Sequence, residues 1–166
     1  MAEQEFLAGL GFTGVTARLK RLSDVIMYNA REHYKFLELD IEPNMHLIFL
    51  LLKDADGPMS VTEMAARLKF SHPALIKITK KMQELGYVES LPHPEDGRKT
   101  LLGLTARAMD ALPEFEAHWM RISSVVEDVF GNEFLLALEK AEHTTGESSF
   151  LERCNQSTKS ETKHES

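Results

Sequence analysis

Apolar residues recur every three or four positions through most of the chain, and they follow the pattern of β-strands in one short part. Residues 60–68 and 72–85 each carry an apolar stripe at helical spacing, and a three-residue turn separates them. Residues 87–91 and 99–104 have strand composition, and the two prolines and the glycine of 92–98 are typical of a turn. The pattern therefore predicts helix, turn, helix and β-hairpin in succession.

This succession is the order of a winged helix-turn-helix, which makes DNA binding the working hypothesis. Ser60 or Thr62 can cap the first helix, and Ser60 with Glu63 also fits a capping box. Ser71 can cap the second helix, and Pro73 suits its first turn because the missing amide hydrogen costs little there. Residues 59–60 are expected to add a short strand to the hairpin.

Longer helical patterns flank this part, so the predicted fold class is mainly α with a small β-wing. We expect helices over about 16–39, 45–53, 105–130 and 133–143, and we expect the 45–53 helix to be fully buried. In the 105–130 helix, Thr105 should be the N-cap, Pro113 should kink or restart the helix, and Gly131 should end it. The expected organisation is an N-terminal dimerisation helix (1–44), a winged helix-turn-helix DNA-binding domain (45–104), C-terminal dimerisation helices (105–154) and a disordered tail (155–166) that contains no apolar residue.

The second helix of the pair has a polar and basic outer side, on which we also expect Thr79 and Gln83. Such a helix fits the major groove of DNA, where its N-terminal part reaches base edges. Arg98 at the hairpin tip could enter a minor groove, whose negative potential favours arginine, and Asp96 would hold Arg98 or a wing amide in place. The candidate DNA-binding residues are Ser71, His72, Pro73, Ile76, Lys77, Lys80, Lys81, Arg98 and Lys99.

The alternative is that these charges form an ordinary solvated helix face and turn. Ile76 likewise has two interpretations, a contact with a thymine methyl group or packing inside the protein.

Three motifs within 59–105 occur in the same order in a known family. Asp96-Gly97-Arg98 leads after five residues into Leu104-Thr105, Leu85-Gly86-Tyr87-Val88 joins the second helix to the hairpin, and residues 62–68 form the first helix. In this combination the segment resembles the MarR family of bacterial transcription regulators. The chain departs from the family at Pro73 and Ile76, where small hydroxyl residues are common, and at Ser90, where a basic residue is common. These departures concern base recognition and leave the expected fold unchanged.

The resemblance implies a homodimer formed by intertwined N- and C-terminal helices, and a small-molecule effector that releases the protein from DNA. The flanking helices are also too apolar for one small domain to bury, which favours the dimer over a monomer that packs them on the winged domain. A two-fold dimer would place two recognition helices about 34 Å apart on a palindromic operator. The expected function is therefore sequence-specific transcription regulation, with repression as the expected mode.

The resemblance also implies an effector pocket between the dimer helices and the winged domain. Its candidate residues are Tyr28, Arg31, Tyr34, His46, Phe49 and Trp119, for which an ordinary core position is the alternative.

Two acid–histidine pairs have the helical spacing that suits zinc, Glu42 with His46 and Glu114 with His118. Two ligands are few, so we interpret them as unrelated surface pairs and expect no metal or other cofactor. Cys154 is far from the N-terminal helix in which redox-sensing relatives of the family carry their cysteine, so a thiol switch is not expected.

Composition agrees with an intracellular globular protein. With 43% hydrophobic residues the chain can form a core, and its single cysteine excludes an intramolecular disulfide, which fits a reducing cytoplasm. No signal-peptide pattern is visible, and the longest apolar run, 47–52, is too short to span a bilayer. We therefore expect a cytoplasmic protein.

The net charge of −7 argues against a general nucleic-acid binder, but the charge is unevenly distributed. Residues 66–99 contain seven basic and four acidic residues, a balance of +3, which leaves −10 on the rest of the chain. A basic face on an acidic body would bind DNA in one orientation.

Two other functional classes were compared with the sequence. A winged-helix protein-interaction module that has lost DNA binding is favoured by Pro73, Ile76, Ser90 and the negative charge, and the absence of duplex binding at low salt would identify it. An enzyme is disfavoured, because the chain has no G-x-S-x-G, no glycine-rich phosphate loop and no H-E-x-x-H. In addition, His33, His72, His93 and His143 have no obvious acid, base or nucleophile partners at fixed spacing.

Overall fold

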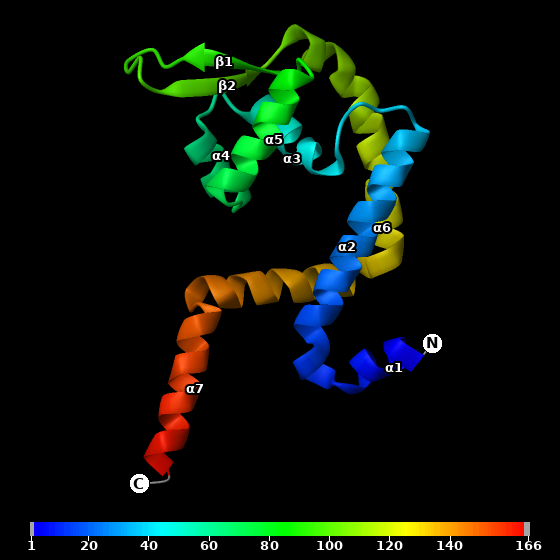
Figure 1. The fold of residues 1–166 in the computed structure, drawn as a ribbon, viewed down its shortest axis with the longest axis vertical. Helices are drawn as coiled ribbons and strands as arrows, with labels where there is room; N and C mark the ends of the chain where they lie inside the picture. The colour runs from blue at the N-terminus through cyan, green and yellow to red at the C-terminus, as the bar shows by residue number, and fades with distance from the viewer. Residues whose placement is uncertain (1, 165–166) are drawn as a thin grey trace. The chain divides into compact units, whose positions relative to one another are not determined.

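The computed structural model describes residues 2–164 and the side chains of residues 6–159. The chain divides into two compact units, Met1–Glu114 and Phe115–Ser166. The first unit contains α1 (Ala2–Gly9), η1 (Gly11–Gly14), α2 (Val15–Phe36), η2 (Pro43–Met45), α3 (His46–Asp54), α4 (Val61–Leu68), α5 (His72–Glu84), β1 (Val88–Pro92), β2 (Thr100–Leu104) and the start of α6 (Ala106–Glu147) (Figure 1). The second contains the rest of α6 and α7 (Phe150–His164). The predicted fold, mainly α with a small β-wing, is confirmed.

Helix α4 begins with the predicted capping box. The Ser60 N–H donates to Glu63 Oε2 at 2.8 Å, and the Glu63 N–H donates to Ser60 Oγ at 3.2 Å, so two backbone amides of the first turn are satisfied. Ser60 is therefore the cap, and Thr62 is exposed within the helix. Met64 is the fully buried residue of α4, and the helix ends at Lys69, whose φ of 52° is left-handed.

Helix α5 follows after the short turn, capped by Ser71, whose hydroxyl accepts from the Ala74 N–H. Leu75 and Met82 are fully buried, as their spacing predicts. Thr79 is 3% exposed, although we expected it on the outer side. Position 79 follows Leu75 by four residues and precedes Met82 by three, which places it on the buried stripe, and its hydroxyl is satisfied by donating to the Leu75 carbonyl at 2.9 Å.

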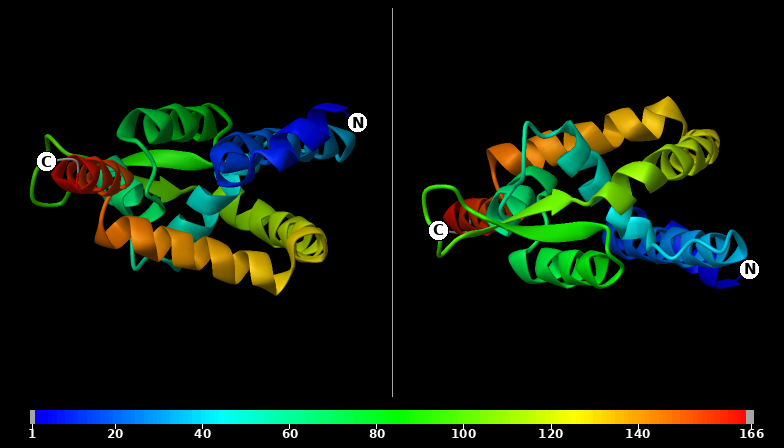
Figure 2. Two further views of the ribbon diagram at one scale, coloured as in Figure 1. Left: turned by 90° about the horizontal axis from the view of Figure 1, so that it is seen from below. Right: turned by 90° about the horizontal axis from the view of Figure 1, so that it is seen from above.

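The hairpin forms as predicted. Strands β1 and β2 pair antiparallel, with Val88 opposite Leu104 and Pro92 opposite Thr100, and the connecting loop projects beyond the strand ends (Figures 1 and 2). The expected third strand is a bridge between Met59 and Leu102, made of two backbone hydrogen bonds of 3.0 and 2.8 Å. Gly86, between α5 and β1, has a left-handed conformation with φ 78°, which is typical of a helix C-terminus.

The core of the first unit lies between α3, α4, α5 and the hairpin. Ile48 and Phe49 of α3 are fully buried, and the Tyr87 ring meets Phe49 edge-on with centroids 5.4 Å apart. Leu50 is exposed on the other side of α3, so the helix buries one face and not its whole circumference. The apolar run predicted the burial of α3 but not this exposed side.

Thr105 caps α6, its hydroxyl accepting from the Ala108 N–H at 3.2 Å. The helix continues through Pro113, where we expected a kink or restart, and its backbone leaves helical geometry at Gly131, with φ 66° and ψ 167°. The predicted stop at Gly131 is therefore a bend inside α6, and Phe130 and Phe134 stack across it with ring centroids 4.7 Å apart.

Helix α7 covers most of the segment for which we expected a disordered tail. Ser149 and Glu152 form a second capping box, in which the Ser149 N–H donates to the carboxylate at 2.8 Å. Residues 151–159 are exposed, so this helix is stabilised by its cap and by helix-forming side chains and not by burial. Residues 165–166 of the expected tail lie outside the described part. Within residues 2–164, no helix is both long and apolar enough to cross a membrane.

Candidate nucleic-acid interface

The outer face of α5 presents the predicted candidates to solvent. His72, Pro73, Lys77, Lys80 and Lys81 are all exposed. Ile76 is 46% exposed, which decides between its two interpretations in favour of an outward position. An exposed helix face with three lysines and one branched apolar side chain has the chemistry for phosphates and for a thymine methyl group.

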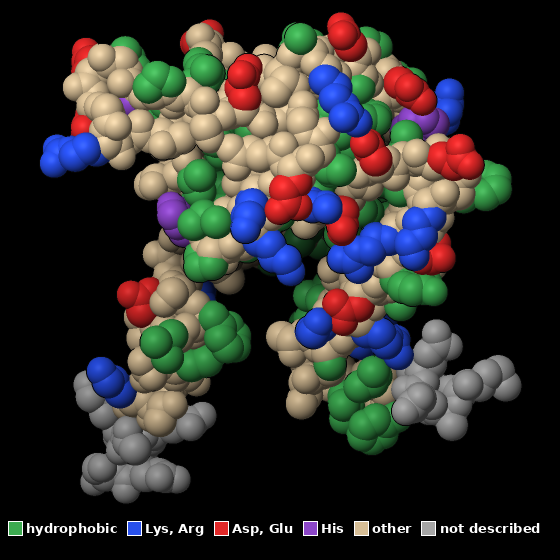
Figure 3. All heavy atoms as spheres, turned by 45° about the horizontal axis from the view of Figure 1, so that its top comes forward, with side chains coloured by type: hydrophobic (Ala, Val, Ile, Leu, Met, Phe, Trp, Pro, Cys, Tyr) green, Lys and Arg blue, Asp and Glu red, His purple; other side chains and the backbone are tan. Residues whose placement is uncertain are grey.

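The wing tip places its charged residues around one carboxylate. Asp96 Oδ1 accepts from the Arg98 N–H at 3.2 Å and from Arg98 Nε at 3.3 Å, and Asp96 Oδ2 lies 3.9 Å from Lys99 Nζ. The Arg98 side chain is 93% exposed, and that of Asp96 is 28% exposed. Figure 3 shows basic side chains at the outer end of the hairpin. Asp96 therefore holds both the backbone and the side chain of Arg98, and the guanidinium group is left exposed at the outside of the turn.

A direct link between α5 and the wing was not predicted from the sequence. Gln83 Nε2 near the end of α5 donates to Ser90 Oγ on β1 at 2.7 Å. The two residues are polar and seven positions apart, so no periodic pattern connects them. Ser90, at a position where basic residues are common in the family that the sequence resembles, is here a hydrogen-bond partner of α5.

A second missed group lies where α5, β1 and α6 meet. Asp40 accepts from the Tyr87 hydroxyl at 2.6 Å and from Arg107 Nη2 at 2.8 Å, and the Arg107 guanidinium lies 4.6 Å from the Tyr87 ring centroid. Burial raises the pKa of Tyr87, and its hydrogen bond to Asp40 raises it further. Each of the three residues looks like an isolated polar position in the sequence, which is why the group was not predicted.

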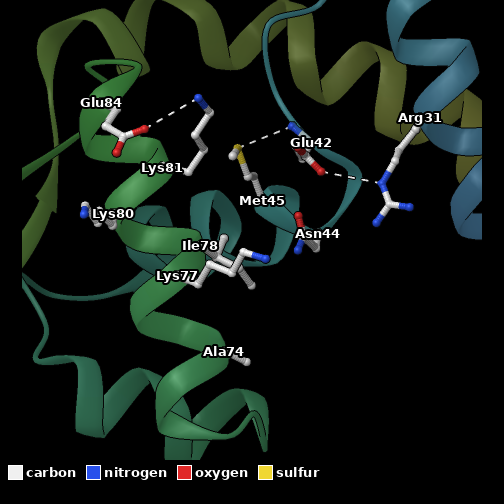
Figure 4. Close-up of a pocket in the computed structure, with 10 residues that line it drawn as sticks. All are labelled: Arg31, Glu42, Asn44, Met45, Ala74, Lys77, Ile78, Lys80, Lys81 and Glu84. Atoms are coloured by element: carbon white, nitrogen blue, oxygen red, sulfur yellow. Dashed lines mark hydrogen bonds and ion pairs between the residues drawn. The ribbon is translucent and has the colours of Figure 1, made fainter.

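A hollow of about 480 Å³ lies beside α5 (Figure 4). Lys77, Lys80 and Lys81 line it from α5, and Arg31 of α2 and Glu42 before η2 line it from the other side. Arg31 Nε is 3.6 Å from Glu42 Oε2, so the two form an ion pair at its rim. Among the six predicted effector-pocket residues, Arg31 is the one in this lining.

The other five effector candidates have different surroundings. Tyr34 and Phe49 are buried core residues, while Tyr28 is 62% exposed on α2. A His46 ring nitrogen contacts the Pro43 carbonyl oxygen. Trp119 belongs to the second unit, where its ring lies 5.9 Å from that of Phe115. The lining of the hollow is largely charged, and it shares only Arg31 with the six candidates.

Among the residues that the structure describes, no group of three or more His, Cys, Asp or Glu side chains is arranged to hold an ion. Glu42 instead pairs with Arg31.

A helix-turn-helix joined to a two-stranded wing, with lysines along the second helix and an arginine at the wing tip, defines a winged helix-turn-helix protein. The model of the MarR family matches residues 39–99. The HTH-type transcriptional repressor YetL of Bacillus subtilis (strain 168) is 31% identical over 104 residues, which cover 61% of this chain and 62% of that relative's length. The chain is therefore similar to MarR-family regulators over its central part, where the wing and helix motifs indicated the resemblance.

Several solved structures have a similar fold. A MarR/EmrR family transcriptional regulator from Acinetobacter sp. ADP1 is similar with a TM-score of 0.67 and 20% identity over 80% of this chain and 95% of the other. The S. aureus MepR–DNA complex is similar with a TM-score of 0.65 and 15% identity, and the match covers 81% of this chain and 96% of the other. Reduced AbfR bound to DNA is similar with a TM-score of 0.64 and 20% identity, and the match covers 88% of this chain and 96% of the other. The first of these structures is a transcriptional regulator, and the other two were solved in complex with DNA.

Proposed function

We propose that this protein is a sequence-specific transcription regulator that binds duplex DNA through α5 and the wing. The observation that carries the proposal is that the exposed lysines of α5 and the exposed Arg98 lie on two elements joined by the Gln83–Ser90 hydrogen bond. MepR and AbfR were solved with DNA, and the Bacillus relative is a repressor, which supports DNA binding and repression here. Such a regulator acts where the bacterial chromosome lies, in the cytoplasm.

The DNA-binding form that we propose is a homodimer. In the first unit, Phe12, Tyr28 and Phe36 are 97%, 62% and 81% exposed on the N-terminal helices. The second unit exposes a further apolar set on α6, namely Val125, Val129, Leu135 and Leu136. Exposed apolar residues in such number are typical of an interaction surface, and two-fold dimers are the commonest assembly. A two-fold dimer would bind a palindrome with half-sites about 34 Å apart.

The hollow beside α5 is our proposed site for an effector that releases DNA. Lys77, Lys80 and Lys81 belong both to its lining and to the proposed DNA-binding face, so a small molecule that engages them competes with phosphate. The Arg31–Glu42 pair at its rim offers one cationic and one anionic partner. For a compound that lowers DNA affinity, Arg31→Ala should reduce the rise in melting temperature that the compound causes while leaving DNA binding in its absence unchanged.

The experiment that tests the function is selection of random-sequence duplexes by the full chain at near-physiological salt, followed by sequencing. We expect an enriched palindrome with half-sites one helical turn apart. The double variant Lys77→Ala/Arg98→Ala is the control and should enrich nothing. If the folded, dimeric wild type also enriches nothing, and binds no duplex at low salt, the interaction-module alternative replaces DNA binding.

A further inference from the structure

His93 occupies the inside of the wing-tip turn. It follows β1 directly, and its backbone N–H donates to the Lys99 carbonyl at 3.2 Å, which closes the loop. Its ring Nδ1 accepts hydrogen bonds from the backbone N–H groups of Glu95 and Asp96, each at 3.2 Å. The ring is half-buried, whereas Arg98 on the outside of the same turn is almost fully exposed. One side chain therefore satisfies two amides that the turn leaves without backbone partners.

These two hydrogen bonds require the neutral ring. An imidazole nitrogen accepts only through a free lone pair, so the proton of the neutral ring must be on Nε2. Protonation places a hydrogen on Nδ1, which would then point at two N–H groups and could accept from neither. Histidine is the side chain whose charge ordinarily changes between about pH 5 and 8. The wing tip is thus held by a contact that acid removes.

The hydrogen bonds of His93 are connected to Arg98 through Asp96. His93 fixes the amide of Asp96, and the Asp96 carboxylate accepts from the N–H and Nε of Arg98. The Asp96 carbonyl also accepts from the Lys99 N–H at 2.9 Å. The direction of Arg98 therefore depends on Asp96, and the conformation at Asp96 depends on the His93 ring.

We propose that His93 is a positioning residue for Arg98, and that protonation of its ring releases the wing tip and weakens DNA binding. The proposal rests on the proposed DNA-binding function. It adds a pH dependence that belongs to one residue and does not involve an effector.

The charged groups around the ring act in both directions. Glu63 of α4 is close enough for His93 to contribute to the lowered pKa of the Glu63 carboxyl, although the hydrogen bonds from Ser60 contribute more. The same turn also contains the acidic residues Glu95 and Asp96 and the basic residues Arg98 and Lys99. A protonated ring would add one positive charge near DNA, but it would add it to a turn of mixed charge with Glu63 nearby. The loss of the two amide contacts should therefore dominate.

Amide NMR of the full chain without DNA tests the contact itself. On lowering the pH from 8 to 5.5, the Glu95 and Asp96 amide resonances should move with the same midpoint as the His93 ring resonances. In His93→Asn these movements should disappear, because the asparagine oxygen can take the place of Nδ1 as acceptor and does not titrate. Amides that move equally in the wild type and in His93→Asn, or that do not follow the ring, would overturn the proposed contact.

Fluorescence anisotropy on the selected operator, at constant salt, tests the consequence. At pH 8 the wild type and His93→Asn should bind alike, and His93→Ala should bind about fivefold more weakly, the factor expected for one net hydrogen bond. At pH 5.5 the wild type should have lost about fivefold relative to His93→Asn. His143→Asn is the matched control, since His143 is an exposed histidine of α6, and it should retain the wild-type pH profile.

Two results would overturn the regulatory role, namely equal pH profiles for wild type and His93→Asn, or tighter binding by the wild type in acid. If no variant binds any duplex at low salt, the proposed function fails and the regulatory role fails with it. The NMR titration would still decide separately whether His93 caps the turn.

Discussion

The Tyr87 hydroxyl donates a 2.6 Å hydrogen bond to Asp40, which lies 47 positions earlier in the chain. Arg107 donates to the other oxygen of the same carboxylate and also covers the tyrosine ring. The loop before η2, the residue before β1 and the first turn of α6 are thereby joined. Because the Tyr87 N–H also donates to the Met82 carbonyl at 2.9 Å, the beginning of the wing is fixed to the end of α5.

Replacing Tyr87 by Phe should lower the free energy of unfolding by about 1 kcal/mol, because the carboxylate of Asp40 loses a donor while the ring still packs on Phe49. The raised pKa of Tyr87 means that its contribution is fully present below the ordinary tyrosine pKa, about 10, and is lost as the pH rises through the folded-state value. Urea unfolding at pH 7 and above pH 10 measures both effects. Tyr28→Phe, at an exposed tyrosine, should change neither, and equal stability of Tyr87→Phe and wild type would show that the hydrogen bond contributes nothing.

The α4 capping box should be sensitive to acid. Hydrogen bonds from the Ser60 side chain and backbone lower the pKa of Glu63, so its stabilising effect is present above the ordinary glutamate pKa and is lost as the pH falls through the lowered value. The difference in urea midpoint between wild type and Glu63→Ala should therefore shrink between about pH 5 and pH 3. Ser60→Ala should cost about 1 kcal/mol at pH 7, and the control Thr62→Ala should cost much less. A larger loss of stability in Thr62→Ala than in Ser60→Ala would show that Thr62 is the N-cap of α4.

Thr79 should behave as a core residue. Thr79→Val should change the free energy of unfolding by less than about 1 kcal/mol, because its hydroxyl donates to carbonyls that belong to the helix ladder. Thr79→Lys should cost about 3 kcal/mol or more, because it buries an unpaired charge. The neighbouring exchange Lys80→Thr, at an exposed position, is the control and should leave stability nearly unchanged. A stable Thr79→Lys protein would place this side of α5 at the surface.

The two proposed DNA contacts should differ in kind. Lys77→Ala should weaken binding to all sequences and make the salt dependence shallower by about one unit of log–log slope, because a phosphate contact releases about one counterion. Arg98→Ala should weaken operator binding by about 1–3 kcal/mol if the arginine contacts base edges in a groove. Lys20→Ala removes a charge from α2 and is the control, with little expected effect. Unchanged affinity in Arg98→Ala would exclude the wing from recognition.

The elements between Met59 and Thr105 could be predicted to within a few residues, because local rules determine them. The Ser60–Glu63 box, the Pro73 first turn and the Gly86 cap each act within a few positions. Helix α7 shows the limit of composition, since the absence of apolar residues suggested disorder and a local cap gives a helix instead.

The candidate site was only partly predictable for a different reason. The outward residues of α5 follow from spacing, and the misplacement of Thr79 came from weighing its polarity above its position four residues after Leu75. Asp40 and Arg107 lie 67 positions apart, and no periodicity relates one polar side chain to another over that distance. The contacts of Gln83 with Ser90 and of His93 with two amides likewise depend on how the hairpin turns back.

The Gln83–Ser90 hydrogen bond connects α5 directly to the wing. With α5 and β1 joined by this 2.7 Å hydrogen bond, the spacing between the DNA contacts proposed for the helix and those proposed for the wing is restrained. An operator half-site bound in the proposed way would tolerate no inserted base pair between its helix-contacted and wing-contacted positions. Ser90→Ala removes this hydrogen bond and should relax the spacing requirement while operator binding persists. Half-sites of different length should then compete with the original half-site for the variant.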